Sequence, residues 1–173
     1  MPVREIFQLG HPTLWQEAAG VGDTKAVETI ATIRDLSDTL DDFRSRYGRG
    51  RGIAAPQIGV ARRIVYVRMP DGSFDGPLIN PQVVWGSSER LELWDDCMSF
   101  PDLMIRVMRV ASIRLEYLDA GGDRRELEAS GDLSELLQHE IDHLDGILAI
   151  RRAVGPGAFA TRAEWERRYK NRD

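Results

Sequence analysis

The sequence is poor in cysteine and histidine, with one cysteine and three histidines among 173 residues. A single cysteine excludes a disulfide within the chain and is typical of proteins kept in a reducing compartment. The first residues, Met1 to Glu5, carry no signal-peptide pattern. Together these absences favour a cytoplasmic protein.

A basic surplus and long apolar runs are also missing. The net charge is −5, so broad nucleic-acid binding, which requires excess lysine and arginine to neutralise phosphates, is not expected. No apolar run approaches the roughly 20 residues of a membrane span, so no membrane partner is expected either. With 42% hydrophobic residues, the chain can bury a real core, and we predict a single domain, 1–173. The sequence does not determine the oligomeric state; a monomer is the default expectation.

Two of the three histidines lie together in the run His139-Glu140-x-x-His143. Residues at positions i and i+4 share one face of a helix, so both imidazoles can reach one metal ion. Glu140 places a carboxylate beside that metal, where it can take a proton from metal-bound water. The run therefore predicts metal-assisted hydrolysis.

Hydrophobic periodicity predicts an α+β fold. Mixed or antiparallel β-sheets are expected to pack around the metal-binding helix, 133–144, with a long N-terminal helix, 24–47, and a C-terminal helix, 162–170, that docks on the body. The long helix should bury a stripe at spacings of three and four, comprising Val27, Ile30, Ile33, Leu36, Leu40 and Phe43. Asp23 or Thr24 is expected to cap its start, and Gly48 to end it. The predicted strands are 63–69, 78–84, 90–94, 104–110, 112–118 and 124–129, with a short last one at 147–150.

Two histidines do not complete a catalytic metal site, which commonly has three protein ligands and one open position. His11 lies far away in a Gly-His-Pro turn and is expected at the surface. Glu164 follows His143 at a distance that would suit a zinc endopeptidase, but it stands in a charge-rich segment. Cys97 is the remaining candidate. A lone cysteine is commonly just a small buried hydrophobe, so the residues around Cys97 must indicate whether it is a metal ligand.

Those neighbours resemble the peptide deformylase family, which carries three motifs in a fixed order. The segment 50–59, Gly-Arg-Gly-Ile-Ala-Ala-Pro-Gln-Ile-Gly, is similar to the first motif. The segment 95–99, Asp-Asp-Cys-Met-Ser, is a looser match to the second, and 138–143, Gln-His-Glu-Ile-Asp-His, matches the third fully. The resemblance covers roughly residues 5–152, and all three motifs in this order are far more specific than the histidine pair alone.

The resemblance implies that Cys97, His139 and His143 bind one divalent metal, Fe²⁺ natively, with Zn²⁺, Ni²⁺ or Co²⁺ able to substitute. It implies that Glu140 is the general base, and that the Gln57 side chain and the Met98 backbone N–H stabilise the oxyanion. The reaction would release formate from the N-terminal formylmethionine of nascent peptides. The positions predicted to contact substrate are Gly50, Arg51, Gly52, Asp96, Arg109, Asp132, Glu135 and Leu136.

Several charged residues depart from the family pattern. Arg51, Asp132 and Glu135 stand where family members carry apolar residues that line the substrate cleft, and Asp96 replaces a glycine. Asp132 and Glu135 could instead form a capping box at the start of the metal-binding helix. Otherwise Arg51 could pair with Asp132, Glu135 or Asp96, because unpaired buried charge is costly.

These departures leave several functions open. The chain could be an ordinary deformylase, or a deformylase-like amidohydrolase acting on a more polar N-formyl or N-acyl substrate. A non-catalytic descendant is a third possibility, against which the intact set of Cys97, His139, Glu140 and His143 argues. A zinc endopeptidase would need Glu164 in place of Cys97.

Overall fold

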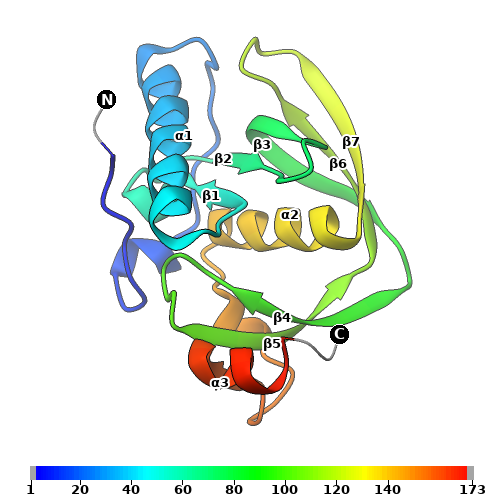
Figure 1. Ribbon diagram of the computed structural model, residues 1–173. Coiled ribbons are helices and arrows are strands. Elements are labelled where there is room, and N and C mark those ends of the chain that lie inside the picture. Colours follow the sequence, from blue (N-terminus) through cyan, green and yellow to red (C-terminus); the bar gives the residue numbers. More distant parts are fainter. Residues whose placement is uncertain (1–2, 171–173) are drawn as a thin grey trace.

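Two antiparallel β-sheets form the body of the molecule in the computed structural model, which describes residues 3–170 (Figure 1). In order, the larger sheet contains β1 (Gly52–Ala54), β2 (Ile64–Arg68), β3 (Asp75–Gly86), β6 (Ser112–Leu118) and β7 (Arg124–Ser130). The smaller sheet contains β4 (Arg90–Asp96), β5 (Leu103–Val110) and β8 (Phe159–Thr161). Every strand pair in both sheets is antiparallel. The predicted α+β class is therefore confirmed.

Helix α2 (Gly131–Leu144) runs between the two sheets (Figure 1). It contacts β1 and β7 of the larger sheet and β5 of the smaller one. Three of its leucines, Leu136, Leu137 and Leu144, are buried in the core beneath the larger sheet. Burial of apolar side chains at helical spacing thus fixes both the position and the rotation of the helix. No helix among residues 3–170 is long and apolar enough to cross a bilayer.

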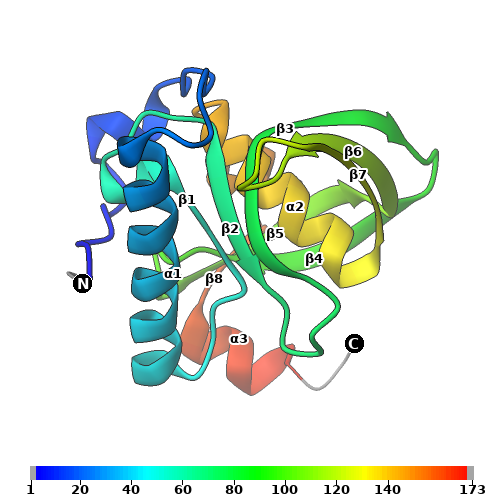
Figure 2. The same cartoon turned by 90° about the horizontal axis from the view of Figure 1, so that it is seen from above.

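Helix α1 (Val27–Tyr47) packs beside β1 and β2 (Figure 2). The predicted apolar stripe is correct in its second half, where Leu36, Leu40 and Phe43 are buried against the sheet. It is wrong in the first half, where Val27 is 78% exposed and Ile30 is 41% exposed. There the helix buries threonines instead, and periodicity alone does not show where a long helix leaves the core.

The predicted N-terminal cap of α1 is wrong, and the predicted end is right. The cap position is Ala26, which makes no side-chain hydrogen bond. Asp23 instead accepts a hydrogen bond from the Lys25 backbone N–H at 2.8 Å, closing a local turn before the helix. Gly48 ends the helix in the left-handed conformation, at φ 67°, as a glycine after a C-terminus is expected to do.

Two short strands were not predicted, and one predicted strand is wrong. Strand β1 lies in the glycine-rich segment, and β8 follows a glycine-rich turn, so neither shows a strand period. Residues 147–150 were predicted as a strand, but a 3₁₀ helix, η3, occupies Ala149–Arg152. The capping box that Asp132 and Glu135 could have formed is absent, because α2 begins at Gly131 and its cap, Ser130, makes no side-chain hydrogen bond.

The C-terminal helix docks on the smaller sheet, as the sequence predicts. Helix α3 (Arg162–Arg168) is capped at its N-terminus by Thr161, whose side chain accepts a hydrogen bond from the Glu164 N–H at 3.3 Å. The ring of Tyr169, just beyond it, lies 5.0 Å from that of Trp94 on β4. The first residue of α3, Arg162, forms a 2.5 Å ion pair with Asp96 at the end of β4. The helix therefore braces the strand that leads to Cys97.

Candidate active site

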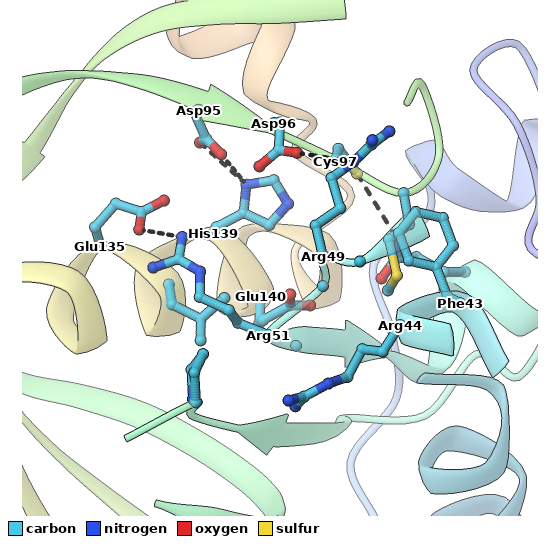
Figure 3. A pocket seen from close by; sticks show the side chains of 17 residues that line it. Phe43, Arg44, Arg49, Arg51, Asp95, Asp96, Cys97, Glu135, His139 and Glu140 are labelled. Carbon is cyan, nitrogen blue, oxygen red and sulfur yellow. Dashed lines mark hydrogen bonds and ion pairs between the residues drawn. The ribbon is translucent and has the colours of Figure 1, made fainter. Parts of the chain in front are cut away.

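Cys97, His139 and His143 come together between α2 and the end of β4 (Figure 3 shows the first two). The two histidines lie one helical turn apart on α2, and Cys97 follows directly after β4. Their ligand atoms all lie within 4.8 Å of one another, and all three side chains are buried. Cys97 Sγ is 3.3 Å from His143 Nε2. The fold thus assembles the predicted three-ligand set from residues more than forty positions apart.

Asp95 orients the first histidine. Its carboxylate lies 2.9 Å from His139 Nδ1 and is itself 2% exposed. A carboxylate on Nδ1 holds the proton there and leaves Nε2 free for a metal. Asp95 is a site residue that was not predicted, although its position two residues before Cys97 in the second motif was a signal for it.

The donor set fits a divalent metal. Burial raises the pKa of the Cys97 thiol, because a buried thiolate needs a positive charge beside it. Burial, reinforced by the nearby His139, lowers the pKa of His143 well below its usual value. A neutral imidazole and a thiol that ionises beside a cation are suitable ligands for Fe²⁺, Zn²⁺, Ni²⁺ or Co²⁺.

Glu140 lies next to this cluster with one oxygen unpaired. Its side chain is 3% exposed, and its Oε2 atom has no hydrogen-bond partner within residues 3–170. Burial raises the pKa of Glu140 to about 7. A buried carboxylate with a pKa near neutrality and a free oxygen is suited to accept and return a proton.

Gln57 is held with its amide N–H₂ group toward Cys97. Its Oε1 accepts a hydrogen bond from the Ala54 N–H at 2.9 Å, and its Nε2 donates to Ser99 Oγ at 3.1 Å. Nε2 is also 3.6 Å from Cys97 Sγ. These contacts fix which way the amide faces, so a donor is already oriented beside the metal ligands.

A cavity of about 480 Å³ opens beside the three-ligand cluster (Figure 3). Met98 lines it next to Cys97, and Phe43, Arg44 and Arg49 form part of its wall. Phe43, Arg44 and Arg49 were not predicted, because nothing in their local sequence marks them as cavity residues. The predicted residues that do line the cavity are Gly50, Arg51, Gly52, Gln57, Asp96, Cys97, Met98, Glu135, Leu136, His139 and Glu140.

Two residues predicted to contact substrate lie elsewhere. Asp132 is exposed on the first turn of α2 and does not line the cavity. Arg109 is 3% exposed and lies behind the cavity wall, 2.9 Å from Asp95 and 2.5 Å from Asp142. Asp142 is paired in turn with Arg152 at 2.7 Å. Arg109 therefore holds the carboxylate that orients His139, which is a positioning role.

The alternative third ligands are far from the cluster. Glu164 forms ion pairs with Arg167 and Arg168 on the exposed face of α3. His11 stacks on Phe7, with 3.7 Å between ring centroids, and starts a short 3₁₀ helix. The only three-residue metal-ligand cluster within residues 3–170 is the one that contains Cys97.

The family model for polypeptide deformylase matches residues 3–157. The chain belongs to the peptide deformylase family. The predicted family and the predicted enzyme type are confirmed by this match and by the relatives that share it. Residues after 157, which include the Arg162 that pairs with Asp96, lie beyond the part matched by the family model.

Curated peptide deformylases are similar over most of their length. Peptide deformylase 2 of Clostridium perfringens is 37% identical over 153 residues, covering 88% of this chain and 94% of the relative. The peptide deformylase of Rhizobium meliloti is 41% identical over 155 residues, covering 87% and 84%. Identity at this level over nearly whole chains supports a shared fold and a shared site.

Solved deformylase structures superpose well on the fold. The Thermotoga maritima enzyme has a TM-score of 0.81 at 28% identity, covering 90% of this chain and all of its own. The Synechococcus elongatus enzyme, solved in complex with actinonin, has a TM-score of 0.82 at 28% identity, covering 90% and 81%. The two-sheet arrangement around α2 is therefore the deformylase fold.

Proposed function

We propose that the protein removes the N-formyl group from the N-terminus of nascent peptides in the cytoplasm, releasing formate. The proposal rests on family membership together with a cavity that brings a three-ligand cluster, a buried carboxylate and an oriented amide donor to one point. The family resemblance implies formylmethionine as the first residue, and the charged residues Arg51 and Glu135 in the cavity wall are the reason that a more polar N-formyl substrate stands as the alternative. The proposal requires one divalent metal, Fe²⁺ natively, with Zn²⁺, Ni²⁺ or Co²⁺ as substitutes.

Cys97, His139 and His143 would hold that metal. When bound, it would supply Lewis acidity and make water at the site acidic enough to lose a proton near neutral pH. Asp95 and Arg109 keep His139 in the correct orientation from behind.

Glu140 is the proton carrier in this proposal. Its carboxylate accepts the proton of the attacking water, and the same proton is then delivered to the departing peptide amine. The formyl carbon gains the oxygen of water and leaves as formate, while the peptide leaves with a free amino terminus. The unpaired Oε2 and the raised pKa of Glu140 support this double role.

Gln57 and the Met98 backbone N–H are the donors that we assign to the oxyanion. Both residues line the cavity beside Cys97. The Gln57 amide is fixed by Ala54 and Ser99, so it needs no reorientation when charge develops on the carbonyl oxygen. Removal of one such donor generally costs about 10²–10³ in rate.

The observation that carries the proposal is the buried Glu140 carboxylate beside three ligand atoms within 4.8 Å of one another. The test is release of formate from formyl-Met-Ala-Ser by protein loaded with Ni²⁺ or Co²⁺. Acetyl-Met-Ala-Ser serves as the matched control, because it keeps the peptide and removes the formyl group. Formate release that stops on chelation is expected. No formate from any formyl peptide by protein that binds metal would reject the proposal.

A further inference from the structure

An ion pair forms part of the cavity wall. Arg51 Nη2 lies 2.8 Å from Glu135 Oε2, and both residues line the cavity beside Glu140 (Figure 3). The pair joins β1's leading loop to the first turns of α2, so residues 84 positions apart meet across the cavity. The structure thus selects one of the three partners that the sequence left open for Arg51.

The two partners differ in exposure. The Glu135 side chain is 7% exposed, while that of Arg51 remains 30% exposed. A buried carboxylate is stable only with its counter-charge, so Glu135 holds Arg51 at the cavity wall. Because Arg51 lines the cavity and its side chain remains in part exposed, the guanidinium keeps a polar face toward the cavity.

That polar face carries unused hydrogen-bond donors. A guanidinium has five N–H donors, and the described residues provide Arg51 with one side-chain acceptor, Glu135. Arg49 also lines the cavity. It donates a hydrogen bond to the Pro101 carbonyl oxygen at 3.1 Å and lies 3.7 Å from Asp96, which is already paired with Arg162 at 2.5 Å. The cavity wall formed by residues 49–51 is therefore rich in donors and poor in acceptors.

We propose that this cavity selects N-formyl peptides whose first side chain ends in a hydrogen-bond acceptor, with Arg51 as the specificity-determining residue. The inference rests on the proposed deformylation and names its substrate class. An amide oxygen, as in glutamine, satisfies the requirement. So does the sulfoxide oxygen of oxidised methionine, which converts an apolar side chain into a polar one of similar length.

The physical reason for this preference is the free-energy cost of removing water from a polar group when no new hydrogen bond replaces it. A methionine thioether is a weak acceptor. Packing it against Arg51 would remove water from the guanidinium without forming a hydrogen bond of similar strength. A hydrogen bond to a charged group recovers that loss. We expect a preference of about 10- to 100-fold in kcat/KM for the acceptor-bearing side chain.

The first test uses the wild-type holoenzyme loaded with Ni²⁺. Formate release is compared for formyl-Met-Ala-Ser, formyl-norleucine-Ala-Ser, formyl-Gln-Ala-Ser and the methionine sulfoxide peptide. The glutamine and sulfoxide peptides are expected to exceed the methionine and norleucine peptides by at least tenfold. Equal or higher kcat/KM for methionine would overturn the inference, because the comparison needs no mutation.

The second test changes the pair itself. Arg51→Ile/Glu135→Leu removes both charges together and leaves no unpaired buried carboxylate. It should reverse the preference, raising kcat/KM on the methionine peptide and lowering it on the glutamine peptide. The matched control is Arg114→Ala/Glu128→Ala, which removes an exposed pair of the same chemistry, 3.2 Å apart, outside this cavity. An unchanged preference in the cavity variant would contradict the assignment of Arg51.

Two further measurements keep the test independent of folding and of turnover. If the double variant does not fold, Arg51→Lys retains the charge but loses the planar fork, and should reduce the preference several-fold. Calorimetric titration with the product peptides Met-Ala-Ser and Gln-Ala-Ser should show tighter binding of the glutamine peptide. No formate from any peptide rejects the proposed function, whereas formate with a methionine preference rejects only the inference about Arg51.

Discussion

Gly52 lies directly against the carboxylate of Glu140. A Cβ atom at Gly52 would come within 2.6 Å of Glu140 Oε1 and 2.9 Å of its Cγ. Distances below about 3 Å are not tolerated between such atoms, so one of the two must move. Gly52, the first residue of β1, therefore leaves the space that the Glu140 side chain occupies beside the metal ligands.

Replacement of Gly52 by alanine should displace Glu140. Because a shift of about 1 Å in a reacting group can cost about 10²-fold in rate, Gly52→Ala is expected to lower kcat on formyl peptides by roughly that factor. Metal content should remain at one per chain, since the three ligands are not touched. Gly22→Ala is the control, because a Cβ there meets no atom within 4 Å. Full activity in Gly52→Ala would show that the Glu140 position is not limiting.

The pH dependence of turnover should follow Glu140. Burial raises its pKa to about 7, and a bound cation favours the carboxylate and so lowers it again. A general base works only when deprotonated, so kcat/KM should fall as pH drops below a pKa at or under about 7. A rate profile from pH 5 to 9 with an inert buffer series measures this limb. Activity that rises toward pH 5 would contradict the assignment of Glu140 as base.

Loss of the carboxylate behind His139 should weaken metal binding. Asp95→Asn removes the charge that lies 2.9 Å from both His139 and Arg109. Changes at such supporting positions commonly cost about 10- to 100-fold in metal affinity, and competition with a chromogenic chelator measures it. Asp119→Asn, which breaks an exposed pair with Arg125, is the matched control and should retain wild-type affinity. Equal affinity in both variants would remove Asp95 from the site.

The pair between Arg162 and Asp96 should contribute to stability. Arg162 is 14% exposed and Asp96 is 37% exposed, so solvent screens the pair in part, and Arg162→Leu should lower the free energy of unfolding by about 1 kcal/mol. Chemical denaturation measures the change. Arg168→Leu breaks a solvent-exposed pair on α3, which water screens more fully, and should lower the free energy of unfolding by less than Arg162→Leu does. A larger effect at Arg168 would show that α3 docks through other contacts.

The parts of the site that were predictable are those set by local spacing. His139, Glu140 and His143 stand on one helix, so their relative placement follows from helical geometry alone. The motif around Cys97 and Gln57 supplied two further members through family resemblance. Asp95 was missed as a site residue, because its contact with His139 spans 44 positions and depends on how β4 meets α2.

The partners of the charged cavity residues could not be predicted from the sequence. Asp132 and Glu135 fit a capping pattern, but Glu135 points to Arg51, and Asp132 is exposed. Local preference for a cap is worth about 1 kcal/mol, less than the cost of leaving the buried Glu135 carboxylate unpaired. The ion pair between Arg51 and Glu135 therefore forms in place of the helix cap. Only the three-dimensional arrangement reveals which partner Arg51 takes.

In the long helix α1, too, only part of the predicted structure is correct. Its apolar period correctly predicted the helix and its buried second half, but Val27 and Ile30 are exposed. The strands with clear patterns, β2 to β7, were predicted within a few residues, while β1 and β8, of three residues each, were not. Strands this short owe their existence to their neighbours in the sheet.

The most direct test of the account is formate release by Glu140→Ala compared with the wild type, both loaded with Ni²⁺ and matched for metal content. The variant is expected to bind one metal per chain through Cys97, His139 and His143, yet to release formate from formyl peptides at least about 100-fold more slowly. Full activity in the metal-loaded variant would contradict the role of Glu140 as proton carrier, on which the proposed mechanism depends.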